Sequence, residues 1–191
     1  AAKAGVEVVH VVDESLLKDI IRDNGLSKPT ARRVVGHIIS AEQAGTDFVV
    51  VTCSSIGPAA ELGGRLVDVP VMRVDEPMAE LAARKGSRVG VVATLASTLN
   101  PTAELIRSKA GNVQVLSRLC EGAFQAVVSG DAATHDGIVA AALRDLAEQV
   151  DVIVLAQASM ARVVKALPAG SLAVPVLASP RLAIEHLARV L

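Results

Sequence analysis

The chain has 191 residues, and 51% of them are hydrophobic, which excludes a disordered chain that has too little apolar surface to fold. Nineteen basic and twenty acidic side chains give a net charge of −1 at pH 7, without the basic excess that a polyanion-binding protein needs. There are two Phe and neither Tyr nor Trp, so base-stacking platforms and aromatic cages for quaternary ammonium groups are excluded. We therefore expect a small polar ligand, and no nucleic acid as partner.

Apolar runs such as residues 48–51 are short, whereas a membrane span needs about 20 apolar residues, so we predict no membrane association. The first ten residues lack the basic head and apolar run of a secretory signal, and the default prediction is a cytoplasmic protein. The chain opens on Ala1-Ala2-Lys3 without a Met and enters a strand-like run at once. We expect the natural protein to start earlier.

Short β-branched segments alternate with longer Ala-, Leu- and Arg-rich segments of helical period, which predicts βαβ units and mainly parallel sheets. The predicted strands are 6–12, 47–52, 69–74, 88–93, 113–116, 151–155 and 173–177. The predicted helices are 14–24, 28–44, 56–64, 77–84, 100–110, 123–130, 136–149, 161–167 and 180–190. Lys28-Pro29-Thr30 fits a helix start with Pro in the first turn, and Asn100-Pro101 fits a capped start.

The chain also contains a weak internal repeat. Residues 46–55 align with residues 150–159 at a constant offset (151 − 47 = 104 and 157 − 53 = 104). A second match, at an offset of 105, aligns residues 69–72 with residues 174–177. This order of matches indicates a duplication, although any two buried parallel strands share some likeness. Because ligands of open α/β sheets lie outside the carboxyl ends of the strands, the repeat predicts one cleft with Cys53 and Gln157 on opposite walls.

Thr52-Cys53-Ser54-Ser55 follows a predicted strand and precedes a helix. The partial positive charge at a helix N-terminus favours a thiolate, and hydroxyls with free N–H groups can hold a carboxylate. The alternative is ordinary packing, because Cys is a frequently buried residue and Ser a common helix cap.

Hydroxyl groups also follow the strand predicted at 88–93, where Thr94, Ser97 and Thr98 precede a helix. They suit an anionic or amide ligand. The alternative is capping of the following helix, which explains Asn100 and Thr102 well but Thr94 and Ser97 less well. Cys120 is predicted to be a packed thiol, and His135, beside two Asp residues, a surface cap or ion pair. No two His have metal-ligand spacing and no glycine-rich phosphate motif occurs, so we predict neither a metal nor a nucleotide cofactor.

Three stretches together resemble the aspartate/glutamate/hydantoin racemase superfamily, in particular its hydantoin-racemase-like branch, which also contains the arylmalonate decarboxylases. They are residues 51–55 (Val-Thr-Cys-Ser-Ser), 90–98 (Gly-Val-Val-Ala-Thr-Leu-Ala-Ser-Thr) and 155–161 (Leu-Ala-Gln-Ala-Ser-Met-Ala). Val69-Pro70-Val71 followed by Glu76 is similar to a further stretch of that family.

The resemblance implies an α/β protein of two pseudo-symmetric domains, each a mainly parallel sheet flanked by helices, with the ligand cleft between them and no cofactor. Residues 1–84 with 176–191 would form the first domain, without the family's first strand, and residues 85–175 the second. The ligand would be a small carboxylate or cyclic amide, and the apolar composition leads us to expect a homo-oligomer. The resemblance also implies that Cys53 is a catalytic acid/base; the predicted substrate-binding residues are Thr52, Ser54, Ser55, Thr94, Ser97, Thr98, Ala158 and Ser159.

The sequence departs from the family at Gln157, which stands where the second catalytic cysteine is expected. An amide donates and accepts hydrogen bonds but does not relay a proton as a thiol does, so a racemisation with two thiols is in doubt. As a catalytic residue, Gln157 would instead bind substrate oxygen or stabilise developing enolate charge. Three functions stay open: a racemase-like isomerase acting at an α-carbon, a one-cysteine decarboxylase, lyase or cis-trans isomerase, and a non-catalytic protein that binds small anions.

Overall fold

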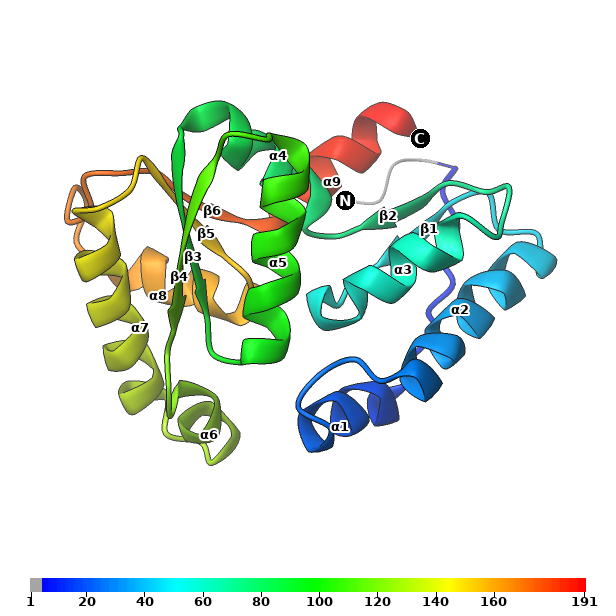
Figure 1. Cartoon of the computed structure of the whole chain (residues 1–191), viewed down its shortest axis with the longest axis horizontal. Coiled ribbons are helices and arrows are strands. Elements are labelled where there is room, and N and C mark those ends of the chain that lie inside the picture. Colours follow the sequence, from blue (N-terminus) through cyan, green and yellow to red (C-terminus); the bar gives the residue numbers. More distant parts are fainter. Residues whose placement is uncertain (1–4) are drawn as a thin grey trace.

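The computed structural model describes residues 5–191, so the first four residues of the predicted first domain lie outside the described part. Two parallel sheets lie side by side, each with its helices (Figure 1). The elements of the first half are α1 (Glu14–Arg22), α2 (Lys28–Gln43), β1 (Val49–Val51), the 3-10 helix η1 (Ser54–Ile56), α3 (Gly57–Gly64) and β2 (Val71–Arg73). Those that follow are α4 (Glu76–Lys85), β3 (Arg88–Ala93), α5 (Ala96–Lys109), β4 (Gln114–Leu119), α6 (Ala123–Val128), α7 (Ala132–Ala147), β5 (Val152–Leu155), the 3-10 helix η2 (Ala158–Met160), α8 (Ala161–Ala166), β6 (Val176–Ala178) and α9 (Ser179–Val190).

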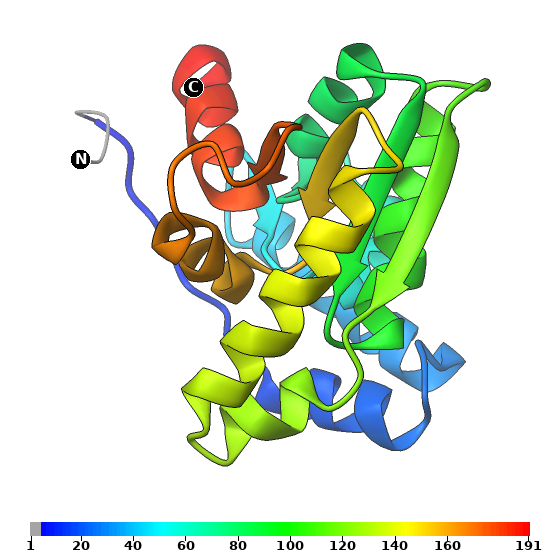
Figure 2. The same cartoon turned by 90° about the vertical axis from the view of Figure 1, so that its left-hand side faces the viewer.

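The larger sheet has the strand order β4-β3-β5-β6, and β1 pairs with β2 in the smaller one. Helices α4 and α5 pack on one face of the larger sheet through Met78, Ala79 and Ile106, and α7 and α8 pack on the other face. Figure 1 shows α5 and α7 on opposite sides of the strands, and in Figure 2 α7 crosses in front of them. Because helices cover both faces, β5 is apolar along its length and β3 is apolar after its exposed first residue, Arg88. The predicted α/β fold is confirmed.

The segment 6–12 was predicted to be a strand, and this prediction is wrong. It has no regular secondary structure, and Val9 and Val12 are 77% and 81% exposed. A strand requires a partner for its backbone N–H and C=O groups, and within residues 5–191 no strand pairs with this segment. Each of the other predicted strands is present within three residues of its expected ends.

Helix α5 begins four residues before the predicted start at Asn100. Thr98 N and Leu99 N both donate to the carbonyl of Leu95, which begins the helix there. Pro101 therefore lies inside the helix rather than in its first turn. The proline costs one backbone hydrogen bond, but the residues before it contain no helix breaker and the chain continues through it. As a result, Ser97 and Thr98 belong to the first turn of a helix instead of a loop.

Strand β6 lies in the larger sheet, where it pairs with β5. This placement differs from the division expected from the sequence, which assigned residues 176–191 to the first domain. Helix α4, which was also assigned to the first domain, contributes Met78, Ala79 and Ala82 to the core around β3 and β5. The sheet pairing of β6 and the packing of α4 are what the structure shows, and the division into two domains stays a prediction.

The internal repeat has a structural counterpart in two βαβ units of the same register. Val49 pairs with Val71 in the first unit, and Ile153 pairs with Val176 in the second. These positions correspond at the offsets of the sequence repeat (153 − 49 = 104 and 176 − 71 = 105). The amide of Val49 donates to Pro70, and that of Ile153 to Pro175, both at 2.9 Å. Equivalent strand ends of the two units are therefore directly comparable.

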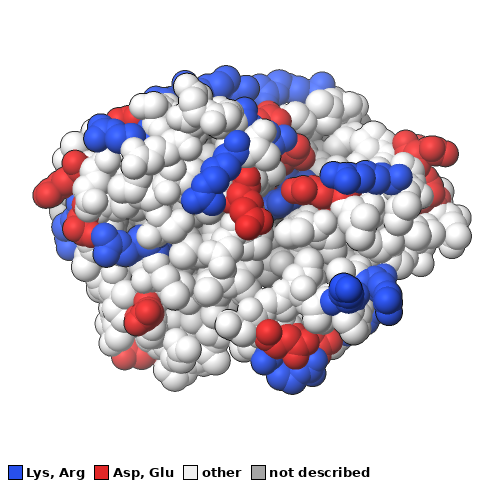
Figure 3. Space-filling model, viewed as in Figure 1, with Lys and Arg blue, Asp and Glu red and all other residues white. Residues whose placement is uncertain are grey.

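Acidic and basic side chains lie next to one another on the face shown in Figure 3. Among the described residues, no helix is both long and apolar enough to cross a membrane.

Candidate functional site

Cys53 and Gln157 occupy equivalent positions in the two repeats. Each residue lies between the end of a strand and a 3-10 helix, η1 after Cys53 and η2 after Gln157. Their backbone angles are alike, with φ −117° and ψ 116° at Cys53 and φ −131° and ψ 133° at Gln157. Both side chains are half-buried. The local geometry is thus the same, and the chemistry differs: a thiol in one repeat and a carboxamide in the other.

Thr94, at the end of β3, holds the carboxamide of Gln157. The Thr94 amide donates to Gln157 Oε1 at 2.6 Å, and the Thr94 hydroxyl lies 3.0 Å from the same oxygen. Gln157 Nε2 in turn donates to the Thr94 hydroxyl at 2.8 Å. Since an amide nitrogen carries two hydrogens, one N–H of Gln157 is left for another acceptor.

Ser55 connects η1 to the start of α5. Its hydroxyl lies 2.9 Å from the Thr98 hydroxyl, and both residues are buried. Thr94 lies between β3 and α5, and Thr98 lies in the first turn of α5. The segment from Thr94 to Thr98 therefore contacts η1 through Thr98 and Gln157 through Thr94. It brings together the three stretches of sequence that carry the predicted site.

The remaining predicted substrate-binding residues differ in their exposure. Ser54 is buried, Ser97 is half-buried, and the exposed ones are Thr52, Ala158 and Ser159. Within residues 5–191, no side-chain hydrogen bond joins Ser54, Ser97 or Ser159 to another residue. A role in substrate binding stays a prediction for all five.

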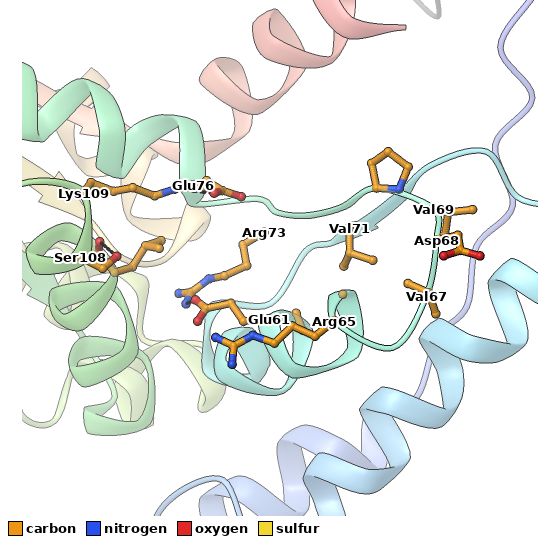
Figure 4. A pocket seen from close by; sticks show the side chains of 14 residues that line it. Glu61, Arg65, Val67, Asp68, Val69, Val71, Arg73, Glu76, Ser108 and Lys109 are labelled. Carbon is orange, nitrogen blue, oxygen red and sulfur yellow. Dashed lines mark hydrogen bonds and ion pairs between the residues drawn. The ribbon is translucent and has the colours of Figure 1, made fainter.

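Two cavities occur away from Cys53 and Gln157. The larger, of about 570 Å³, lies between α3, β2 and the ends of α4 and α5 (Figure 4). The smaller, of about 210 Å³, lies beside the 167–172 loop. Neither has Cys53 or Gln157 among its lining residues, so the predicted cleft between these two residues stays a prediction.

Cys120 is the second thiol of the chain. It is 2% exposed and packs in the core with Ala123, Val139 and Met160, in agreement with the prediction of a packed thiol. Burial raises the pKa of Cys120 to about 11, and the charge of Arg118 opposes this only in part. The thiol stays protonated at neutral pH and is unsuited to act as a base or nucleophile.

Sequence reasoning missed several buried polar side chains. Arg73 and Asp75 form an ion pair that is almost completely buried. His135, predicted to be a surface cap or ion pair, does lie with Nδ1 2.7 Å from Asp136, but it is buried, at 1% exposed. Its Nε2 has no partner within the described residues. Arg73 is the last residue of β2, whose other residues are apolar, and this charged side chain was the one signal in the sequence that could have indicated the ion pair.

The Asp/Glu/Hydantoin racemase family model matches residues 1–187. No curated protein matches the chain. Among solved structures, a putative Asp/Glu racemase from Yersinia pestis is 15% identical with a TM-score of 0.75, and the match covers 96% of this chain and 82% of that one. Glutamate racemase RacE1 from Bacillus anthracis is 18% identical with a TM-score of 0.64, over 84% of this chain and 65% of that one. Allantoin racemase from Klebsiella pneumoniae is 22% identical with a TM-score of 0.63, over 85% and 68%.

Arylmalonate decarboxylase is also similar in structure, at 16% identity and a TM-score of 0.53. The chain spans less than two thirds of the length of the glutamate racemases, with 65% for the Bacillus anthracis enzyme and 62% for that from Francisella tularensis. At these identities the similar structures establish the fold, whereas the family match extends over almost the whole sequence. The chain therefore belongs to the Asp/Glu/Hydantoin racemase family.

Proposed function

We propose that this chain is a cofactor-independent enzyme that moves a proton at the α-carbon of a small carboxylate or amino-acid-like substrate. Cys53 acts as the acid/base. The observation that carries the proposal is the position of Cys53: a half-buried thiol just after the short, partly buried strand β1, followed by hydroxyl side chains. The names of the similar racemases, which act on glutamate and allantoin, support a substrate with an acidic α-carbon.

In this mechanism the Cys53 thiolate removes the α-proton, and the negative charge that develops moves onto the adjacent carbonyl or carboxylate oxygens. Hydrogen-bond donors that already point to those oxygens stabilise this charge, and such stabilisation is often the largest contribution to catalysis. The hydroxyls of Ser54, Ser97 and Ser159 are suited to this, as is the second N–H of Gln157.

Gln157 favours a second candidate, in which chemistry occurs on one face of the substrate only. A carboxamide cannot return a proton from the opposite side, as a second thiol would. A single acid/base suits protonation of a carbanion after decarboxylation, an elimination, or a cis-trans isomerisation that begins with Cys53 as nucleophile. The bonds from Thr94 fix the amide, which supports a role for Gln157 in binding substrate oxygen.

Deuterium exchange in D2O tests the proposal. The chain is incubated with each enantiomer of a panel of amino acids, hydantoins, dicarboxylates and malonates, and α-deuterium is measured by NMR and optical activity by polarimetry. We expect at least one substrate to gain α-deuterium or lose CO2, and Cys53→Ser to abolish this. Cys120→Ser is the matched control and should retain turnover, because that thiol is buried and protonated.

The outcome separates the candidates. Equal loss of optical activity from both enantiomers indicates a racemase, and exchange or decarboxylation without inversion indicates one-sided chemistry. Ligand binding that protects Cys53 from alkylation, together with no turnover on any substrate, would instead indicate a protein that binds small anions. Turnover that survives in Cys53→Ser would contradict the proposed mechanism.

A further inference from the structure

A buried ion pair lies at the end of β2. Arg73 Nε and Nη2 donate to the two carboxylate oxygens of Asp75 at 3.0 and 2.9 Å, and the residues are 4% and 0% exposed. Moving two charges from water into the protein interior carries a desolvation penalty that offsets much of their attraction, so a buried ion pair stabilises a fold little compared with apolar residues. The presence of the Arg73–Asp75 pair therefore calls for an explanation other than stability.

The pair contacts both halves of the molecule. On the side of the first half, Arg73 Nη1 donates to Glu61 of α3 at 2.7 Å. On the side of the second half, Nη2 donates to the carbonyl of Pro101 and the Thr102 hydroxyl donates to Asp75, both at 3.4 Å. Figure 4 shows Arg73 extending from β2 toward Glu61. The guanidinium thus connects β2, α3 and α5.

Gly57, which directly follows η1, lies against this guanidinium. A Cβ added at Gly57 would lie 2.3 Å from Arg73 Cζ, so only glycine allows the first residue of α3 to approach so closely. The corresponding residues of the second repeat are Ala161 and Ala178 (161 − 57 = 104 and 178 − 73 = 105). The repeat with the thiol thus has a glycine and an arginine where the repeat with the carboxamide has two alanines.

We propose that Arg73, paired with Asp75, is a positioning residue that fixes η1 against α5 and thereby sets the place of Cys53. The inference rests on the proposed function. Three residues separate Cys53 from Gly57, and the bond between Ser55 and Thr98 joins the same segment to the same face of α5 as Pro101 and Thr102. Burial by itself lowers the pKa of Arg73, but Asp75 and Glu61 outweigh this and raise it, so the group keeps its charge.

The first test removes the guanidinium group by mutating Arg73 and then supplies free guanidinium in solution. Arg73→Ala should lower kcat for exchange by about 100-fold, the cost of misplacing a reacting group by about 1 Å, with KM changed much less. The cavity of about 570 Å³ is lined by Arg73 and Glu61, so free guanidinium can enter the vacated place. Millimolar guanidinium chloride should restore part of kcat, and equal sodium chloride should not. Arg73→Lys should not replace Arg73, because an ammonium cannot make the bidentate contact.

The second test covers the case in which Arg73→Ala fails to fold, since it leaves Asp75 buried without a partner. The triple variant Gly57→Ala, Arg73→Ala, Asp75→Asn copies the alanines of the second repeat and removes the buried charges. We expect it to fold, with a low kcat and a changed rate of alkylation at Cys53. A folded triple variant with wild-type kcat and wild-type alkylation would overturn the inference. Should the wild-type chain turn over no substrate, the proposed function fails, and the alkylation rate alone then decides the inference.

Discussion

The hydroxyls of Ser55 and Thr98 lie 2.9 Å apart and join η1 of the first half to α5 of the second. Their residues are 3% and 5% exposed, so the bond is shielded from water. Together with the contacts of Arg73 and Asp75 on the same helix, it fixes the segment that carries Cys53. The placement of the thiol is therefore a property of the contact between the two halves.

A double-mutant cycle on Ser55 and Thr98 measures this contact. Ser55→Ala and Thr98→Val should each destabilise the chain by about 1 to 2 kcal/mol, because each leaves a buried hydroxyl without a partner. The double variant should cost about 1 kcal/mol less than the sum of the single variants. Urea unfolding gives these free energies, and Ser97→Ala, a half-buried hydroxyl on the same turn, serves as control. Additive effects would show that the bond does not form in solution.

Replacing Gln157 with cysteine should restore a second thiol at the equivalent position of the repeat. The backbone angles there match those at Cys53, so the new thiol can point as Cys53 does. We expect Gln157→Cys to convert one-sided exchange into exchange accompanied by inversion, measured by chiral chromatography of a substrate incubated in D2O. Ser159→Cys, an exposed thiol two residues further on, should not do so. Inversion that is as fast in the wild type would contradict this interpretation of Gln157.

Thr94 should control the orientation of the Gln157 amide. Thr94→Val keeps the backbone N–H bond to Oε1 but removes the hydroxyl bonded to Nε2. The expected effect is a loss of about 1 kcal/mol in substrate binding or transition-state stabilisation, roughly a fivefold change, whereas Thr94→Ser should retain the wild-type value. Steady-state measurements of kcat/KM for the two variants test this prediction. Equal kcat/KM values for Thr94→Val and Thr94→Ser would show that the hydroxyl has no role in the mechanism.

Cys120 should make the chain less stable in alkali. Its pKa rises from 9.0 to about 11 on folding, so between these pH values the unfolded chain releases a proton that the folded chain retains. Stability must then fall as pH rises through this window, by about 2 kcal/mol at its upper end. Unfolding at pH 8 and pH 11 should show a smaller loss for Cys120→Ala than for the wild type. Val139→Ala, in the same core, should lower stability equally at both pH values.

The sequence alone contained the alternation of strands and helices and the internal repeat. Both depend on signals in the sequence: β-branched runs, helical periodicity, and residues such as Pro70 and Pro175 that recur at a spacing of 104 or 105. These signals were sufficient for the α/β class, the family resemblance, and the equivalent positions of Cys53 and Gln157. The start of α5 was misplaced because Asn100-Pro101 fits a cap equally well, and only the backbone bonds to Leu95 decide it.

The tertiary structure alone decided which polar groups meet. Ser55 and Thr98 are 43 residues apart in the chain, and Thr94 and Gln157 are 63 apart, so no local pattern pairs them. The close approach of Gly57 to the Arg73 guanidinium likewise depends on how α3 packs against β2. The segment 6–12 has a composition that favours a strand, yet it forms no strand. A strand forms only when another segment pairs with its backbone, and such pairing depends on the folded chain.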